Sequence, residues 1–254
     1  MRSLTTTKAE AIFNTIDCVD NFEQLGESDL LRYYTFLNEY AENHNIVLMI
    51  LNKTTLNYEN VTPNFHQFWG LDETETVVSF KGFYPRVLED VSVLGECIEV
   101  HEKLMESFSE PEKMYFSSTF CGAKATTLTG KPVRLIWHTV PLILNGHKQS
   151  KILLCFQKDI IHLTEGDVYW FRIHTGERIY AWFSDQKKIR NKEIISEIEL
   201  SCIRHWAAGM KVSEIARLQC ISVHTVNNHL KAARNRLGVR SNTALVELCN
   251  LLSI

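Results

Sequence analysis

The sequence predicts a two-part chain of the α+β class, in which an antiparallel sheet with helices is followed by an all-α unit of four helices. Between residues 28 and 160, short runs typical of strands alternate with helical runs, whereas residues 195–254 show only helical patterns. The charge balance divides at the same place. Residues 195–254 carry 7 Lys and Arg against 4 Asp and Glu, and the rest of the chain carries 20 against 26.

The clearest element is the helix expected over residues 222–237. Ser222 suits the N-cap because its hydroxyl can accept from the free amides of the first turn, and Gly238 suits the left-handed residue after the last turn. Apolar side chains recur at the helical period and are expected to face the core: Val223, Val226, Leu230, Ala233 and Leu237.

The opposite side of this helix carries amides, imidazoles and cations, and the stretch contains no acid. Asn can bond adenine and Lys can bond guanine in the major groove, while Thr, His and Arg hold phosphates. A solvated helix that merely lacks acids is the alternative interpretation. The side chains expected to contact DNA are Ser222, His224, Thr225, Asn227, Asn228, His229, Lys231, Arg234 and Arg236.

The neighbouring segments predict three more helices. Ser196 and Glu199 can form a capping box that opens a helix ending before Gly209, and a short helix follows over residues 212–218. After a turn, the helix with the polar face begins, and a fourth helix is expected after Ser241. Two short helices joined by a tight turn are the layout in which the second helix enters the major groove.

This run of sequence resembles the LuxR-type (FixJ/NarL-type) helix-turn-helix domain of bacterial transcription regulators. The resemblance covers about the last quarter of the chain and implies DNA binding. It assigns Asn227, Asn228 and Lys231 to base contacts, Thr225 and His229 to the phosphate backbone, and Glu214 to a supporting role at the turn. The matching residues are Glu199, Gly209, Glu214, Ile215, Ala216, Ile221, Ser222, Thr225, Val226, His229, Leu237, Gly238, Val239 and Ser241.

Three positions depart from the family pattern. Asn227 stands where Lys is usual, which removes one phosphate-seeking charge and favours adenine. Lys211 replaces a small capping residue, and Asn242 replaces an Arg. These departures concern contact details rather than the fold.

The order of elements over residues 28–160 is a helix, two strands, short helices, a long helix and three strands. This order, and the stretch YENVTPNFHQFWGLDE, resemble a PAS-like sensor domain, which implies a ligand cavity or a surface for pairing. The inner side of the long helix is expected to hold Val93, Ile98, His101, Leu104, Met105 and Phe108. His101 is a haem-ligand candidate that we interpret as a half-buried helix residue. No cofactor is predicted.

Residues 167–183 predict a β-hairpin with aromatic side chains on both faces, followed by a polar linker. Alone, such a hairpin would be marginally stable. It is therefore expected to pack on the PAS-like sheet, on the helical unit or across a dimer. The predicted segments are residues 1–27 as a helical extension, 28–160 as the PAS-like domain, 161–194 as hairpin and linker, and 195–254 as the DNA-binding domain.

The sequence favours a non-enzymatic, cytoplasmic regulator. The common nucleotide, hydrolase and zinc-protease motifs are absent, the cysteines lack a C-x-x-C pair, and no run has the ~20 apolar residues of a membrane helix. We predict no catalytic residues and no metal site. A phospho-receiver is disfavoured because residues 46–61 offer no acidic pair.

The expected partners are double-stranded DNA and a second copy of the chain. A small molecule in the PAS-like domain and RNA polymerase are compatible with this interpretation, and no membrane contact is expected. Two alternatives stay open: an autoinducer-like pocket in place of the PAS domain, and a protein-interaction module that does not bind DNA.

Overall fold

The computed structural model describes residues 27–52, 55–72, 74–75, 79–109, 116–142, 152–175, 178–252 and 254. Apart from Glu27, the predicted N-terminal helical extension lies outside these residues, as does the predicted turn at residues 145–148. Within the described residues, no helix is long and apolar enough to cross a membrane.

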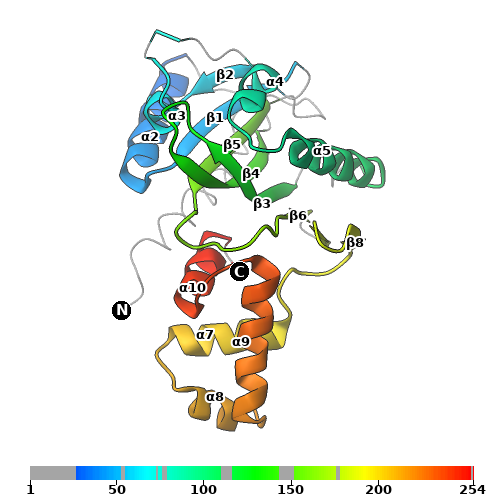
Figure 1. Ribbon diagram of the computed structural model, residues 1–254. Helices are drawn as coiled ribbons and strands as arrows, with labels where there is room; N and C mark the ends of the chain where they lie inside the picture. Colours follow the sequence, from blue (N-terminus) through cyan, green and yellow to red (C-terminus); the bar gives the residue numbers. More distant parts are fainter. Residues whose placement is uncertain are drawn as a thin grey trace.

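One antiparallel sheet of eight strands organises the first three quarters of the chain (Figure 1). Its order is β2-β1-β5-β4-β3-β6-β7-β8. The strands are β1 (Val47–Asn52), β2 (Tyr58–Val61), β3 (Ser117–Thr126), β4 (Pro132–Leu142), β5 (Ile152–Asp159), β6 (Trp170–His174), β7 (Ile179–Phe183) and β8 (Lys188–Arg190).

The helices that follow β2 and precede β3 in the sequence cover one face of this sheet. They are α3 (Asn64–Trp69), α4 (Phe80–Phe83), the 3-10 helix η2 (Tyr84–Arg86) and α5 (Val91–Glu106). Trp69, Phe83 and Tyr84 are buried there against Leu135 and Trp137 of β4. The predicted order of elements is confirmed, including the stop of α3 at Gly70, which has a left-handed φ of 69°.

The opposite face of β1 and β5 carries helix α2 (Glu27–His44). Because side chains alternate along a strand, Val47 and Met49 join the core on one face, while Leu48 packs with Leu37 and Ala41 of α2 on the other. The helix predicted over residues 28–42 is thus confirmed, and both faces of this part of the sheet are buried.

The aromatic hairpin is part of the same sheet, because β6 pairs with β3 from Ser117↔His174 to Cys121↔Trp170. Its side chains alternate between two cores. Phe171 and Trp182 join the core beneath α5, whereas Trp170 and Phe183 join a second core shared with the C-terminal helices. Of the three predicted packing partners, the hairpin contacts both the sheet and the helical unit.

The C-terminal helices are α7 (Glu197–Ala207), α8 (Val212–Leu218), α9 (Val223–Leu237) and α10 (Asn242–Leu251). Each begins close to its predicted N-cap, and the Ser196–Glu199 capping box is present. In Figure 1, α10 and the C-terminal end of α9 lie nearest the sheet, while α8 and the start of α9 lie farthest from it. The fold class is confirmed.

Two details of the prediction were wrong. The segment after the hairpin was expected to be a linker, but it contains β8, which pairs with β7 from Ala181↔Arg190 to Phe183↔Lys188. Ile98 was expected on the inner side of α5 but is 40% exposed, whereas Leu104, Met105 and Phe108 are buried as expected. The segment boundaries remain predictions.

Gly122 lies at a bulge in β3, where the β3–β4 register shifts between Cys121 and Ala123. Its φ is +104°, and an added Cβ would lie 2.7 Å from the carbonyl oxygen of Val168. We expect Gly122→Ala to lower the free energy of unfolding by about 3 kcal/mol, since backbone strain and a backbone clash add together. Urea unfolding measures this loss.

Gly130→Ala is the matched control. Gly130 also has a positive φ, +85°, but an added Cβ there would meet nothing within 4 Å. Gly130→Ala should lower the free energy of unfolding by only about 1 kcal/mol, the strain of a non-glycine residue in the left-handed region. Equal losses for the two variants would contradict the crowding at Gly122.

Candidate nucleic-acid interface

Helix α9 has the caps and the buried stripe that the sequence predicts. The Ser222 hydroxyl accepts a hydrogen bond from the amide of Thr225 at 3.0 Å, and Gly238 ends the helix with a φ of 66°. The residues of α9 that are buried are Val226, Leu230, Ala233 and Leu237. Val223 was predicted to belong to this stripe, and this was wrong, because it is 46% exposed.

The exposed residues of α9 lie outside this buried stripe. No Asp or Glu occurs in the helix, so its first turn offers free amides and a positive dipole end without an acid to neutralise them. We call these residues the exposed face of α9: Val223, His224, Asn227, Asn228, Lys231, Ala232 and Asn235.

Three of the predicted contact residues are half-buried beside this face. Thr225 lies in the first turn, with its hydroxyl 2.8 Å from that of Ser222. His229 lies one turn further along. Arg234 donates to Oδ1 of Asn242 at 2.7 Å and so links α9 to α10.

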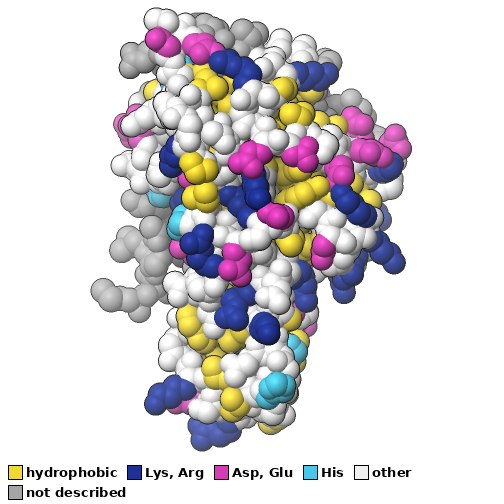
Figure 2. All heavy atoms as spheres, viewed as in Figure 1, with side chains coloured by type: hydrophobic (Ala, Val, Ile, Leu, Met, Phe, Trp, Pro, Cys, Tyr) yellow, Lys and Arg dark blue, Asp and Glu magenta, His cyan; other side chains and the backbone are white. Residues whose placement is uncertain are grey.

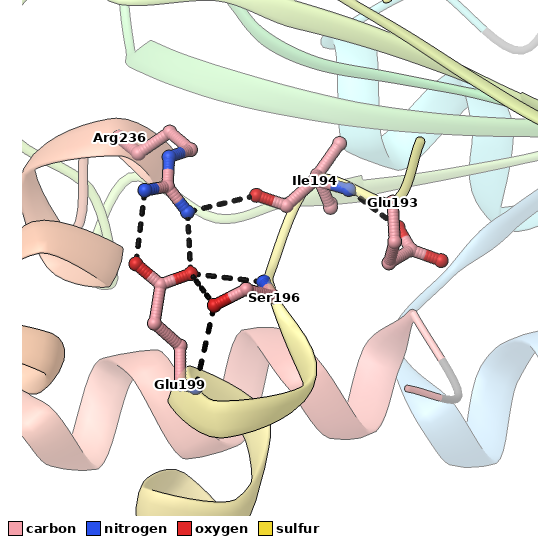
Figure 3. A network of polar contacts seen from close by, with 5 residues as sticks. All are labelled: Glu193, Ile194, Ser196, Glu199 and Arg236. Atoms are coloured by element: carbon pink, nitrogen blue, oxygen red, sulfur yellow. Dashed lines mark hydrogen bonds and ion pairs between the residues drawn. The ribbon is translucent and has the colours of Figure 1, made fainter. Parts of the chain in front are cut away.

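Arg236, also predicted to contact DNA, instead points toward Glu199 at the start of α7 (Figure 3). Its guanidinium forms two hydrogen bonds with the Glu199 carboxylate, at 2.7 and 2.9 Å, and a third with the carbonyl oxygen of Ile194 at 3.1 Å. The same carboxylate accepts from the backbone amide and the hydroxyl of Ser196, at 2.9 and 2.8 Å. These contacts hold the start of α7 against the end of α9.

The ionisation of Glu199 reflects two opposing effects. Burial raises the pKa of its carboxyl, but the hydrogen bonds from Arg236 and Ser196 outweigh burial and hold the pKa below its usual value. The carboxylate is therefore charged at neutral pH.

The turn before α9 is braced from α7 and α8. Gln219 donates to the Ser201 hydroxyl at 2.9 Å and accepts from the Cys202 thiol at 3.2 Å. The Glu214 carboxylate accepts from the amide of Lys211 at 2.7 Å and so caps the start of α8, and its role at the turn before α9 stays a prediction. These contacts fix the position of α8 and of the first turn of α9.

The charged side chains are unevenly distributed over the surface. In Figure 2, acidic side chains gather mainly over the sheet, whereas the end of the molecule formed by α8 and the start of α9 shows mainly Lys, Arg and His. This distribution follows the charge division expected from the sequence. A polyanion would be attracted to that end and repelled by the rest.

The junction between sheet and helices is formed by residues 160–169 together with the hairpin. Glu165 donates its amide to the carbonyl oxygen of Gly238 at 2.7 Å. The Arg240 side chain donates to the carbonyl oxygens of Ile161 and Thr164, at 2.7 and 2.8 Å. The junction therefore contacts the loop that directly follows α9.

An ion pair between Arg172 and Glu193 adds to the contacts at the junction. Arg172 of β6 binds the Glu193 carboxylate through Nε and Nη2, at 3.0 and 2.8 Å, and both side chains are largely buried. The Glu193 carboxylate also accepts from the amide of Ile194, whose carbonyl oxygen binds Arg236. A chain of polar contacts thus connects β6 to the end of α9.

Several residues that position this interface are not predicted by the sequence. Gln219 and Arg240 act through contacts with distant parts of the chain, which leave no local signal. Val223 had a signal, since it immediately follows the N-cap, but the helical period placed it with the core.

An antiparallel sheet unit joined to a helix-turn-helix unit with an exposed, acid-free second helix is an arrangement expected of a DNA-binding regulator. Residues 193–249 match the family model described as bacterial regulatory proteins, luxR family. The predicted LuxR-type helix-turn-helix domain is thus confirmed for this part of the chain.

Some solved structures are similar over more of the chain. A phage VqmA–DPO complex is 12% identical and covers 86% of each chain, with a TM-score of 0.35. The N-terminal domain of a diguanylate cyclase with a PAS/PAC sensor from Marinobacter aquaeolei is 14% identical, with a TM-score of 0.35, and covers 45% of this chain and 94% of its own. The Vibrio cholerae VqmA dimer without target DNA is 13% identical and covers 80% of each chain, with a TM-score of 0.30. No curated protein sequence matches the chain significantly.

The Glu199–Arg236 pair gives a pH-dependent prediction. Glu199→Gln should lower the free energy of unfolding by about 2 kcal/mol at pH 7, because Arg236 loses its charged partner. A depressed carboxyl pKa stabilises the fold above the unfolded-state value of about 4.3, and this stabilisation is lost as the pH falls through the folded-state value. The difference between wild type and variant should therefore narrow between about pH 5 and 3 in urea unfolding.

Glu247→Gln is the matched control, since Glu247 contacts His162 at 3.4 Å with both side chains exposed. It should change stability by less than about 0.5 kcal/mol. A Glu199→Gln loss that stayed constant down to pH 3 would show that the pair acts through packing rather than charge.

Proposed function

We propose that the protein is a transcriptional regulator that binds double-stranded DNA by inserting α9 into the major groove. The observation that carries the proposal is the exposed face of α9, which is free of acids and begins at the end of the molecule far from the acidic sheet. The luxR-family match of residues 193–249 supports it. The match to a family of bacterial regulators supports action on DNA in the cytoplasm of a bacterium.

In the proposed complex, the exposed amides of Asn227 and Asn228 and the ammonium of Lys231 contact base edges, with His224 beside them. Ser222, Thr225 and His229 lie at the side of this face and are proposed to meet the phosphate backbone. Arg234 donates a hydrogen bond to Asn242 and is also proposed to meet the phosphate backbone. For Arg236 we now propose a structural role, because its guanidinium is bound to Glu199.

A second copy of the chain is part of the proposal. The excess of 7 Lys and Arg over 4 Asp and Glu in residues 195–254 is modest, so one copy should bind DNA weakly. Two copies on paired half-sites would bind far more tightly, because the second contact becomes intramolecular. RNA polymerase is a further partner compatible with a regulator.

The sheet unit is proposed to be the input, either as a PAS-like sensor or with an autoinducer-like pocket. The junction supports this role, since it contacts the Gly238–Arg240 loop at the end of α9. A signal alters DNA binding only if it changes contacts that differ between two arrangements. The hairpin and the junction are therefore the proposed relay.

Selection of bound sequences from a random duplex library by the full-length chain tests the proposal. Enrichment of one motif, often as an inverted repeat, is expected of a dimeric DNA reader. Failure to enrich any sequence would favour the alternative of a protein-interaction module.

On the selected sequence, Asn228→Ala should weaken binding by about 1–3 kcal/mol and broaden the base preference, because a bidentate base contact is lost. Asn235→Ala is the matched control: Asn235 is an exposed amide near the other end of α9 and should leave the preference unchanged. Fluorescence anisotropy on cognate and scrambled duplexes measures both. Equal losses on the two duplexes for Asn228→Ala would contradict base readout.

The junction gives a separate prediction. Arg240→Ala removes two hydrogen bonds to the 160–169 loop and should lower the free energy of unfolding by about 1–2 kcal/mol. It should also broaden or split the thermal transition seen by calorimetry, because the two units are less tightly coupled. Arg217→Ala, at an exposed position on α8, should do neither.

A further inference from the structure

The exposed face of α9 contains one strongly apolar side chain, Val223. It occupies the first helical position after the N-cap Ser222 and is 46% exposed. His224 beside it and Asn227 one turn further on are also exposed. Val223 therefore belongs to the same surface as the polar side chains rather than to the buried stripe.

The core of the helical unit does not account for this valine. Val226 and Leu230 are 0% and 2% exposed and pack among the other helices, and Ile221 also packs against this core. Among the residues that the structure describes, Val223 is not part of that cluster. Val223 begins α9, at the end of this helix that lies farthest from the sheet (Figure 1).

A major groove offers one apolar group to such a side chain, the C5-methyl of thymine. In helix-turn-helix complexes, the N-terminal residues of the second helix contact the base edges. Val223 is in the first turn, next to side chains that can bond bases, and no acid of α9 opposes the approach of DNA. A β-branched side chain is also stiff, so little rotamer freedom is lost on contact.

We propose that Val223 packs against a thymine methyl group in each half-site and so selects thymine at that position. This inference rests on the proposed function, since it requires α9 to lie in the major groove. It adds an apolar determinant to the hydrogen-bonding residues of the same face.

Uracil scanning tests the proposal with the full-length chain. In the sequence selected from the random library, each thymine is replaced in turn by uracil, which lacks the methyl group and keeps the base pair. At one thymine per half-site, wild-type affinity should fall about fourfold, the value expected for one buried methyl group. In Val223→Ala the same replacement should change affinity by less than about twofold, and in Val223→Ile the loss should return.

Leu218→Ala is the matched control. Leu218 is 56% exposed but lies at the end of α8, outside the exposed face of α9. It should keep the wild-type response to uracil. Thermal unfolding of each variant checks that the fold is intact, and an exposed Val→Ala change at a first helical position should leave the midpoint nearly unchanged.

The outcomes separate the two proposals. A protein that selects a sequence but ignores every thymine methyl, or whose uracil response is the same in wild type and Val223→Ala, binds DNA without the proposed valine contact. A selected sequence that lacks thymine also overturns the contact alone. If no sequence is selected, DNA reading itself is contradicted, and the contact with it.

Discussion

The β6–β7 hairpin imposes the constraint on which the rest of the structure depends, because it is apolar on both faces. Phe171 and Trp182 must be covered on one side and Trp170 and Phe183 on the other. Full burial of each large side chain contributes about 1.5–3 kcal/mol. The sheet with its helices covers one face and the C-terminal helices cover the other. The two units are therefore joined by a shared core and not only by a linker.

Because of this arrangement, the two ends of α9 are held by different contacts. Its C-terminal end is held by the Arg236–Glu199 pair, by the Arg234–Asn242 hydrogen bond and by Gly238, whose carbonyl oxygen accepts from Glu165. Among the described residues, its N-terminal end is held from within the helical unit, through the braced turn at Gln219. The exposed polar residues His224, Asn227 and Asn228 lie toward this N-terminal end. The C-terminal end of α9 thus contributes to stability, whereas its N-terminal end exposes residues that a partner can contact.

Local signals predicted much of this structure. Caps such as Ser196 and Ser222, the stop at Gly238 and the buried stripe of α9 all depend on neighbours within a turn or two, and the sequence contains them. The Arg236–Glu199 pair joins residues 37 positions apart, so no local pattern indicates it. Strand β8 pairs with the neighbouring β7, but its three residues Lys188–Arg190 are too few and too polar to show a strand pattern. Val223 shows a different limit. The helical period gave it the angle of a core residue, but it is 46% exposed and does not join the cluster that contains Val226.

The difference between the two ends of α9 also affects how the proposed input would change the affinity for DNA. A helix of 15 residues is roughly 22 Å long. If the junction turned the anchored end by about 10°, the free end would move roughly 4 Å, which is close to the 3.4 Å spacing of bases along a strand. In a dimer, such a movement would alter the separation of the two copies of α9, and paired half-sites tolerate little change in spacing. In the proposed function, a small change of contacts around Arg240 and the hairpin would therefore switch affinity without altering the side chains proposed to face the bases.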